Sequence, residues 1–242
     1  MKMNQLAYIF NLLLCTMLFC TTTMAQNGIT TREVTKLEHF DRIVLAADIN
    51  LTIVKADKPK ITIRGERSVI TQVVCQVTDG ELSIYATKFK YKRTKRIDIV
   101  LETDSALTSV YGTSGNKVRC EQAFNCKNLT LTARYGCDFF FNVNADFLKA
   151  KAENGSDIRL VGNARKTDLF AENACSIRAF KLSSEIVSVV ATLSSNVDVS
   201  VGSVLYTSSR DNCEIRYKGN PQQTQISNLD SSRVLPVEDE TL

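Results

Sequence analysis

The sequence predicts an all-β protein, built as a right-handed parallel β-helix, or β-solenoid, that follows a meander of strands. Between residues 129 and 219 the chain repeats itself about every 19 residues. After the first 25 residues no stretch has a convincing helical period, apart from a single turn near 68–72. A repeat of this length is typical of a solenoid, because each unit buries its apolar face only by stacking on its neighbours.

Residues 1–25 are predicted to be a signal peptide. Lys2 is followed by a mostly apolar run over 6–19, and Thr23-Met24-Ala25 places small residues before a cleavage site at Gln26. The alternative is a retained membrane anchor, for which this run is short. No later apolar stretch is long enough to span a membrane. We therefore expect an exported bacterial protein, in the periplasm or at the cell surface, with no transmembrane segment after cleavage.

Residues 26–104 are predicted to form a β meander that is continuous with the solenoid. Alternating apolar residues and turn signals delimit short strands at 41–45, 49–54, 60–64, 73–77, 82–85 and 96–101. Asp79-Gly80 between two of these runs indicates a tight hairpin.

Residues 105–221 are predicted to form about six solenoid rungs. Aligning the repeats on one turn position gives a column of small residues, at Ala133, Ala152, Ala171, Ala191 and Ser209. It also gives an apolar column, at Phe139, Ile158, Ile177, Val197 and Ile215. Six turns at ~4.8 Å give a body roughly 29 Å long. Residues 222–242 are polar and acidic, which predicts a disordered tail.

Six cysteines remain after the predicted cleavage. Cys137, Cys175 and Cys213 occupy one column on alternate turns, ~9.6 Å apart, which exceeds the ~7 Å limit for a disulfide. These three are therefore predicted to be small packing residues. Cys120 and Cys126 are close in sequence, and a disulfide between them stays open as an alternative.

Two groups of basic residues are candidate ligand-binding positions. The first is the run Lys88, Lys90, Lys92, Arg93, Lys95 and Arg96, which is interleaved with Phe89 and Tyr91. Such a run suits acidic polysaccharide, lipid head groups or a partner protein, and the alternative is a solvated, lysine-guarded edge strand. The second group is Arg159 and Arg178, one repeat apart in an outward column. The alternative there is an ordinary solvated sheet face.

The composition and missing motifs exclude several classes of function. A net charge of +4 and an exported chain do not favour nucleic acid as a partner. There is no zinc-protease, phosphate-loop or nucleophile-elbow motif, and His39 is the only histidine. Glu153 and Glu172 lie one repeat apart. Two carboxylates in this arrangement can bind a cation or act as an acid–base pair, but more often they are exposed charges screened by water. No catalytic residue, metal site or cofactor is predicted.

Several segments, in order, resemble a known family. They are Phe40-Asp41-Arg42-Ile43, the strand 47–53, Ile61-Thr62-Ile63-Arg64-Gly65-Glu66, the hairpin at Asp79-Gly80 and the repeated Gly-Ser-Asp-Ile turns. Together they are similar to the head GIN domain family of putative autotransporter adhesins, bacterial envelope proteins of unassigned activity. The sequence departs from the pattern at Asp48, where glycine is expected, and in the cysteines of the turns. The resemblance covers roughly 37–219 and implies a β-solenoid at the cell envelope, with no catalytic residues.

The sequence thus predicts a non-enzymatic, adhesin-like module that binds a glycan or another envelope protein over an extended sheet face. The alternative is a β-helical polysaccharide lyase or hydrolase that uses the columns Asp138/Asp157 and Arg159/Arg178. Unpaired strand edges at the ends of the stack would favour oligomers.

Overall fold

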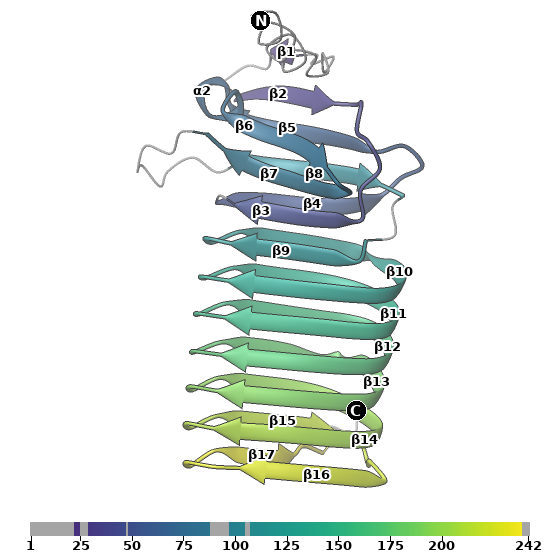
Figure 1. The fold of residues 1–242 in the computed structure, drawn as a ribbon, viewed down its shortest axis with the longest axis vertical. Helices are drawn as coiled ribbons and strands as arrows, with labels where there is room; N and C mark the ends of the chain where they lie inside the picture. The colour runs from purple at the N-terminus through teal and green to yellow at the C-terminus, as the bar shows by residue number, and fades with distance from the viewer. Residues whose placement is uncertain (1–21, 25–28, 47, 88–96, 105–106, 239–242) are drawn as a thin grey trace, which may run out of the picture.

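The computed structural model describes residues 22–24, 29–46, 48–87, 97–104 and 107–238. Almost all of them lie in strands, and the chain winds as a right-handed β-solenoid with two facing sheets (Figure 1). The predicted fold class is therefore confirmed. The predicted basic run at 88–96 falls outside the described residues.

Antiparallel strands close the N-terminal end of the stack. In one sheet β2 (Ile29–Val34) pairs with β5 (Lys60–Glu66), and β5 pairs with β8 (Ile97–Thr103). In the other sheet β6 (Val73–Thr78) and β7 (Glu81–Ala86) form the hairpin predicted at Asp79-Gly80. A single helical turn, α2 (Arg67–Ile70), follows β5 and buries Ile70. The predicted meander is thus in part a cap on the solenoid, whereas its segments at 42–46 and 49–55 begin the parallel stack.

The parallel stack begins where β3 (Arg42–Ala46) pairs with β7, and β4 (Ile49–Lys55) pairs with β8. It continues with β9 (Ser109–Thr113) and five long strands that bend in their middles and so contribute to both sheets. These are β10 (Lys117–Arg134), β11 (Asp138–Glu153), β12 (Asp157–Glu172), β13 (Ser176–Thr192) and β14 (Asn196–Arg210). Their register is parallel throughout, with residues about 19 positions apart facing each other.

Seven tight turns connect the two sheets along one edge of the solenoid. Each places two successive residues at positive φ, from Ser114-Gly115 to Asp230-Ser231, with Asn154 (φ 55°) and Gly155 (φ 70°) as one example. Asparagine and glycine tolerate this left-handed backbone best, which explains why they recur at the turns. The turns lie 18 to 21 residues apart, between positions 114, 135, 154, 173, 193, 211 and 230. The sequence predicted about six turns, and the described residues contain seven of this kind, the last of them beyond the predicted solenoid.

The residue after each turn is a hydrogen-bonding position, buried at every turn except the last, and we call these positions the turn column. It contains Asn116, Cys137, Ser156, Cys175, Ser195, Cys213 and Ser232. The Ser195 hydroxyl donates to the Thr192 carbonyl (2.8 Å) and accepts from the Cys175 N–H on the preceding turn (3.2 Å). The Cys213 thiol donates to Arg210 O (3.1 Å) and accepts from Ser195 N–H (3.3 Å). The cysteines of this column therefore do more than the predicted packing, because they satisfy buried backbone groups.

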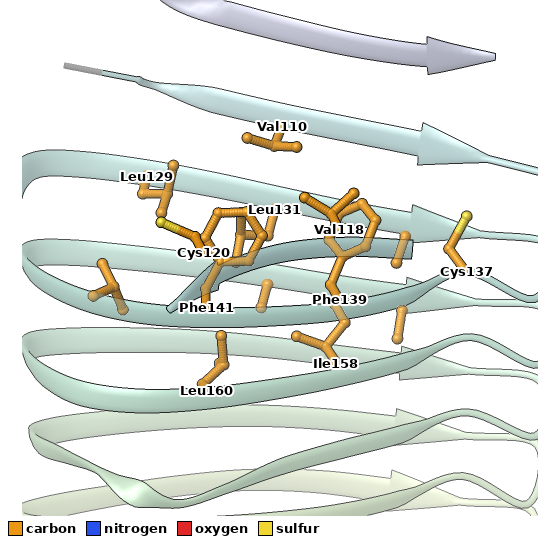
Figure 2. Packing of buried hydrophobic residues seen from close by; sticks show 14 of the residues in the cluster. Val110, Val118, Cys120, Leu129, Leu131, Cys137, Phe139, Phe141, Ile158 and Leu160 are labelled. Carbon is orange, nitrogen blue, oxygen red and sulfur yellow. The ribbon is translucent and has the colours of Figure 1, made fainter. Parts of the chain in front are cut away.

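The core lies between the two sheets, where alternate residues of each strand point inward. Phe139 and Phe141 are fully buried, and their ring centroids lie 6.0 Å apart (Figure 2). Ile158 and Leu160 continue the same columns on the next turn. Gly112 leaves the room that the Phe139 ring occupies, because an added Cβ there would lie 2.8 Å from Cζ of the ring. The predicted apolar columns are thus the core of the molecule.

The predicted disordered tail at 222–242 is wrong for most of its length. β16 (Gln223–Asn228) pairs in parallel with β14, and β17 (Arg233–Pro236) pairs with β15 (Glu214–Lys218). These strands form the last turn of the solenoid. Their side chains are mostly exposed and polar, so backbone pairing rather than apolar burial holds them in place.

At the N-terminus, β1 (Thr22–Met24) pairs antiparallel with β2 through three residue pairs. Cleavage before Gln26 would remove this short strand. The signal peptide remains a prediction.

Candidate ligand-binding surface

An outward column of basic and aromatic residues crosses one sheet of the solenoid. In parallel register, Arg119 lies beside Phe140, Phe140 beside Arg159, and Arg159 beside Arg178. The neighbouring residues along each strand, such as Ile158 and Leu160, are buried, so the arginines point to solvent. The predicted adjacency of Arg159 and Arg178 is therefore found, on a flat surface.

On the next two turns of this face, an arginine is ion-paired with a carboxylate. Arg216 makes two hydrogen bonds to the Asp198 carboxylate, at 2.8 and 2.9 Å. This hydrogen bonding, with the added charge of Asp198, raises the pKa of the Arg216 guanidinium. Among the described residues neither Arg159 nor Arg178 forms an ion pair within 4.0 Å. Two unpaired like charges on adjacent strands, ~4.8 Å apart, favour an anion between them.

The predicted basic run at 88–96 lies outside the described residues, and the strand that follows it in the sequence is β8, at the capped end of the stack. Within its sheet β8 is separated from β12, which carries Arg159, by β4, β10 and β11. At ~4.8 Å per strand, β8 and β12 lie roughly 19 Å apart.

The two carboxylate pairs considered from the sequence lie in different surroundings. Glu153 is nearly buried and forms ion pairs with both Arg134 and Lys151, whereas Glu172 on the next turn is exposed. The charge of Glu153 is thus compensated by Lys151 on its own strand and by Arg134 on the preceding strand. Asp138 and Asp157 face each other in register on the sheet that carries Arg159. Within the described part of the chain, no three His, Cys, Asp or Glu side chains are grouped so that they could hold a metal ion.

Two adjoining shallow hollows lie at the bend between the sheets, opposite the tight turns. Their volumes are about 430 and 660 Å³, and Cys126 and Asn144 line both. Asn125, Asn144 and Asn163 lie on successive turns there, with side-chain hydrogen bonds between them. Sequence analysis missed these residues, although their spacing of 19 is visible in the sequence.

All six described cysteines are free thiols, including Cys120 and Cys126. In β11 their register partners are Phe141 and Ala145, four residues apart, which explains why the two thiols are not bonded. Burial raises the pKa of the Cys75, Cys120 and Cys126 thiols to about 11 each. The alternative of a disulfide between Cys120 and Cys126 is not supported by the structure.

These raised thiol pKa values predict a loss of stability in alkali. The ordinary pKa is 9.0, so above pH 9 the unfolded chain releases thiol protons that the folded chain keeps until about pH 11. The free energy of unfolding that these protonated thiols contribute is therefore fully present below pH 9, and it decreases as the pH rises towards 11. We expect Tm to fall by about 3 °C or more between pH 8.5 and 10.5, measured by circular dichroism.

The matched control is the triple variant Cys75→Ala/Cys120→Ala/Cys126→Ala, whose absolute Tm is lower but whose pH slope should be shallower. Tyrosine and lysine titration is common to both proteins. Equal slopes would show that the thiols do not carry the effect.

Comparison with known proteins shows where this solenoid belongs. Residues 39–221 match the family model described as "Putative auto-transporter adhesin, head GIN domain". The fold is similar to that of a "putative adhesin" from Bacteroides fragilis NCTC 9343, with a TM-score of 0.79 and 18% identity over 88% of this chain and 98% of that one. A second "putative adhesin", from Parabacteroides distasonis ATCC 8503, gives a TM-score of 0.70 and 16% identity over 88% and 98% of the two chains.

A "putative lipid binding protein" from Parabacteroides distasonis ATCC 8503 is also similar, with a TM-score of 0.64 and 15% identity over 88% and 98% of the chains. No curated protein matches the sequence. The family match covers most of the chain, so this protein belongs to the head GIN domain family of putative autotransporter adhesins. Over the residues described, no helix has the length and apolar character needed to cross a membrane.

Proposed function

We propose that this protein is a non-enzymatic adhesion module of the bacterial envelope that binds acidic glycans across its outer sheet face. The observation that carries the proposal is the pair Arg159 and Arg178, in register on adjacent turns and without ion pairs of their own among the described residues. Membership of an adhesin family supports the envelope location and the absence of catalysis.

The flat geometry of the face suits an extended polymer better than a small molecule. Arg119 and Phe140 continue the column on the preceding turns, so a chain laid along the solenoid axis would meet a guanidinium or a ring at each strand. Arginine binds carboxylates and sulfates through paired N–H groups, and an aromatic ring supports the apolar face of a sugar. Repeated anionic groups would therefore find repeated partners.

The double variant Arg159→Gln/Arg178→Gln is expected to weaken binding to uronic-acid and sulfated oligosaccharides by about tenfold or more, the effect of losing roughly 1.4 kcal/mol or more. Binding would be measured on a glycan array and by calorimetry, at low and physiological salt. The wild-type signal should itself weaken with salt, because the charges are exposed.

The matched control is Arg165→Gln, which removes one positive charge at the bend and is compared with the single variant Arg159→Gln, which removes one on the sheet. Equal losses in these two single variants would mean that overall charge, not this face, controls binding. Binding to vesicles with anionic head groups is measured in a second experiment, since one structural neighbour is described as lipid binding. Binding to vesicles alone, without any acidic glycan, would overturn the glycan proposal.

The enzymatic alternative is tested with the same samples. Asp138 and Asp157 face each other on the sheet of Arg159, which is the arrangement that favours a lyase or hydrolase. Release of shortened glycan products, abolished by Asp157→Asn and Arg159→Gln, would establish that alternative and reject a purely adhesive role. We expect the glycan to be recovered intact.

A further inference from the structure

We propose that the two hollows at the bend form a separate binding site for a neutral oligosaccharide. This site extends over the bends of β10, β11 and β12, and neither Arg159 nor Arg178 lines it. It goes beyond the proposed function, because its ligand and its residues differ from those of the arginine face.

The wall of the site is a ladder of three side-chain amides, which we call the amide ladder. Asn144 Nδ2 donates to Asn125 Oδ1 (2.9 Å), and Asn163 Nδ2 donates to Asn144 Oδ1 (3.1 Å). Each of these bonds uses one N–H and one oxygen lone pair. Asn144 therefore keeps one N–H and one lone pair side by side, and these suit a pair of neighbouring sugar hydroxyls.

The ladder also holds the amides in place before a ligand arrives. Parallel register fixes Asn125, Asn144 and Asn163 on adjacent strands, and their mutual hydrogen bonds fix the side-chain rotation. A side chain that is already ordered loses less entropy on binding. This preorganisation distinguishes the ladder from isolated surface asparagines.

The floor and rim of the hollows favour an uncharged ligand. Cys126, Ala145 and Ala164 give a small apolar floor, on which the apolar face of a sugar ring can rest. On the rim, Lys127, Asp146 and Arg165 occupy equivalent positions on successive turns and alternate in sign. When charges of opposite sign lie one strand spacing apart, their electrostatic potentials largely cancel at a ligand that spans them. An anionic ligand therefore gains little binding energy from this rim.

The test uses the purified full chain and neutral tetrasaccharides of glucose, mannose and N-acetylglucosamine as probes. Saturation-transfer NMR should detect binding of at least one probe, with no loss at physiological salt. The variant Asn144→Ser/Asn163→Ser should reduce the affinity of that probe at least tenfold. Serine is the residue that the next turn places in this column, at Ser183, so the variant keeps a side chain that the fold already accommodates.

A matched control is Asn173→Ser, which breaks a similar amide pair, Asn173 Nδ2 to Asn154 Oδ1 (2.8 Å), at the opposite edge of the solenoid. It should leave binding unchanged, as should Arg159→Gln/Arg178→Gln. Shifts of the Asn125, Asn144 and Asn163 side-chain NH2 signals on titration would locate the site without any substitution. Binding of none of the probes, or equal binding by the ladder variant, would overturn this site and leave the acidic-glycan proposal untouched.

Discussion

Gly162→Ala is expected to lower Tm by about 10 °C, the change that roughly 3 kcal/mol or more produces in a chain of this size. An added Cβ at this position would lie 2.2 Å from the Val143 carbonyl oxygen, and the φ of Gly162 is +109°. The clash is with backbone on the neighbouring turn, which cannot rotate away as a side chain can. Thermal unfolding followed by circular dichroism measures the effect.

Two other glycines separate the steric clash from backbone strain. Gly155→Ala keeps a positive φ, +70°, but meets nothing within 4 Å, so we expect a loss of about 1 kcal/mol. Gly202→Ala has its nearest contact at 3.4 Å and should be close to neutral. A Tm for Gly162→Ala no lower than that of Gly155→Ala would show that the bend relaxes around the added methyl group.

Ser195→Ala is expected to destabilise the protein by about 2–4 kcal/mol, with a Tm lower by about 8 °C. The hydroxyl is fully buried, and its removal leaves the Thr192 carbonyl without this donor and the Cys175 N–H without this acceptor. Each buried group left without a partner costs about 1–3 kcal/mol. Chemical denaturation in urea measures the loss directly.

The informative control is Ser195→Cys. The turn column already alternates serine with cysteine, and the Cys175 thiol donates to Glu172 O (3.1 Å) in the same way. Ser195→Cys should therefore recover most of the stability that Ser195→Ala loses. If the cysteine variant were as unstable as the alanine variant, the hydrogen bonds of the turn column would not explain the stability of the turns.

The repeat made most of the fold predictable. In a parallel solenoid, residues one repeat apart face each other, so the columns of Phe139 and Ile158 and the neighbours Arg159 and Arg178 follow from counting. The hydrogen-bonding role of Cys175 and Cys213 could not be predicted from the repeat. Their small size and expected burial were enough to account for cysteine at these positions. Only the turn geometry shows which groups their thiols contact.

The last turn was missed because its sequence lacks the apolar pattern of the others. Where β14 has the inward residues Leu205 and Thr207, β16 has Thr224 and Ile226 among glutamines and serine. A polar segment on its own predicts disorder, since it buries too little apolar surface to offset chain entropy. Here the strand is held by a neighbour that the sequence of the segment does not reveal.

The amide ladder was missed for a different reason. Asn125, Asn144 and Asn163 have the repeat spacing, which predicts that they align on successive turns. Spacing does not predict that their side chains hydrogen-bond to one another, nor that they lie beside a hollow. Those two properties depend on how the strands bend between the sheets, which the repeat does not specify.

The turn column also allows the length of the molecule to change. Because Ser156 and Ser195 make equivalent contacts with carbonyls three residues earlier, we expect that one whole unit can be duplicated or deleted with the hydrogen bonds of the turns retained. Each unit of about 19 residues would add ~4.8 Å of reach and one more row of outward side chains. Internal duplication within the gene would therefore lengthen the stack one turn at a time, and so increase the distance between its two ends in fixed steps.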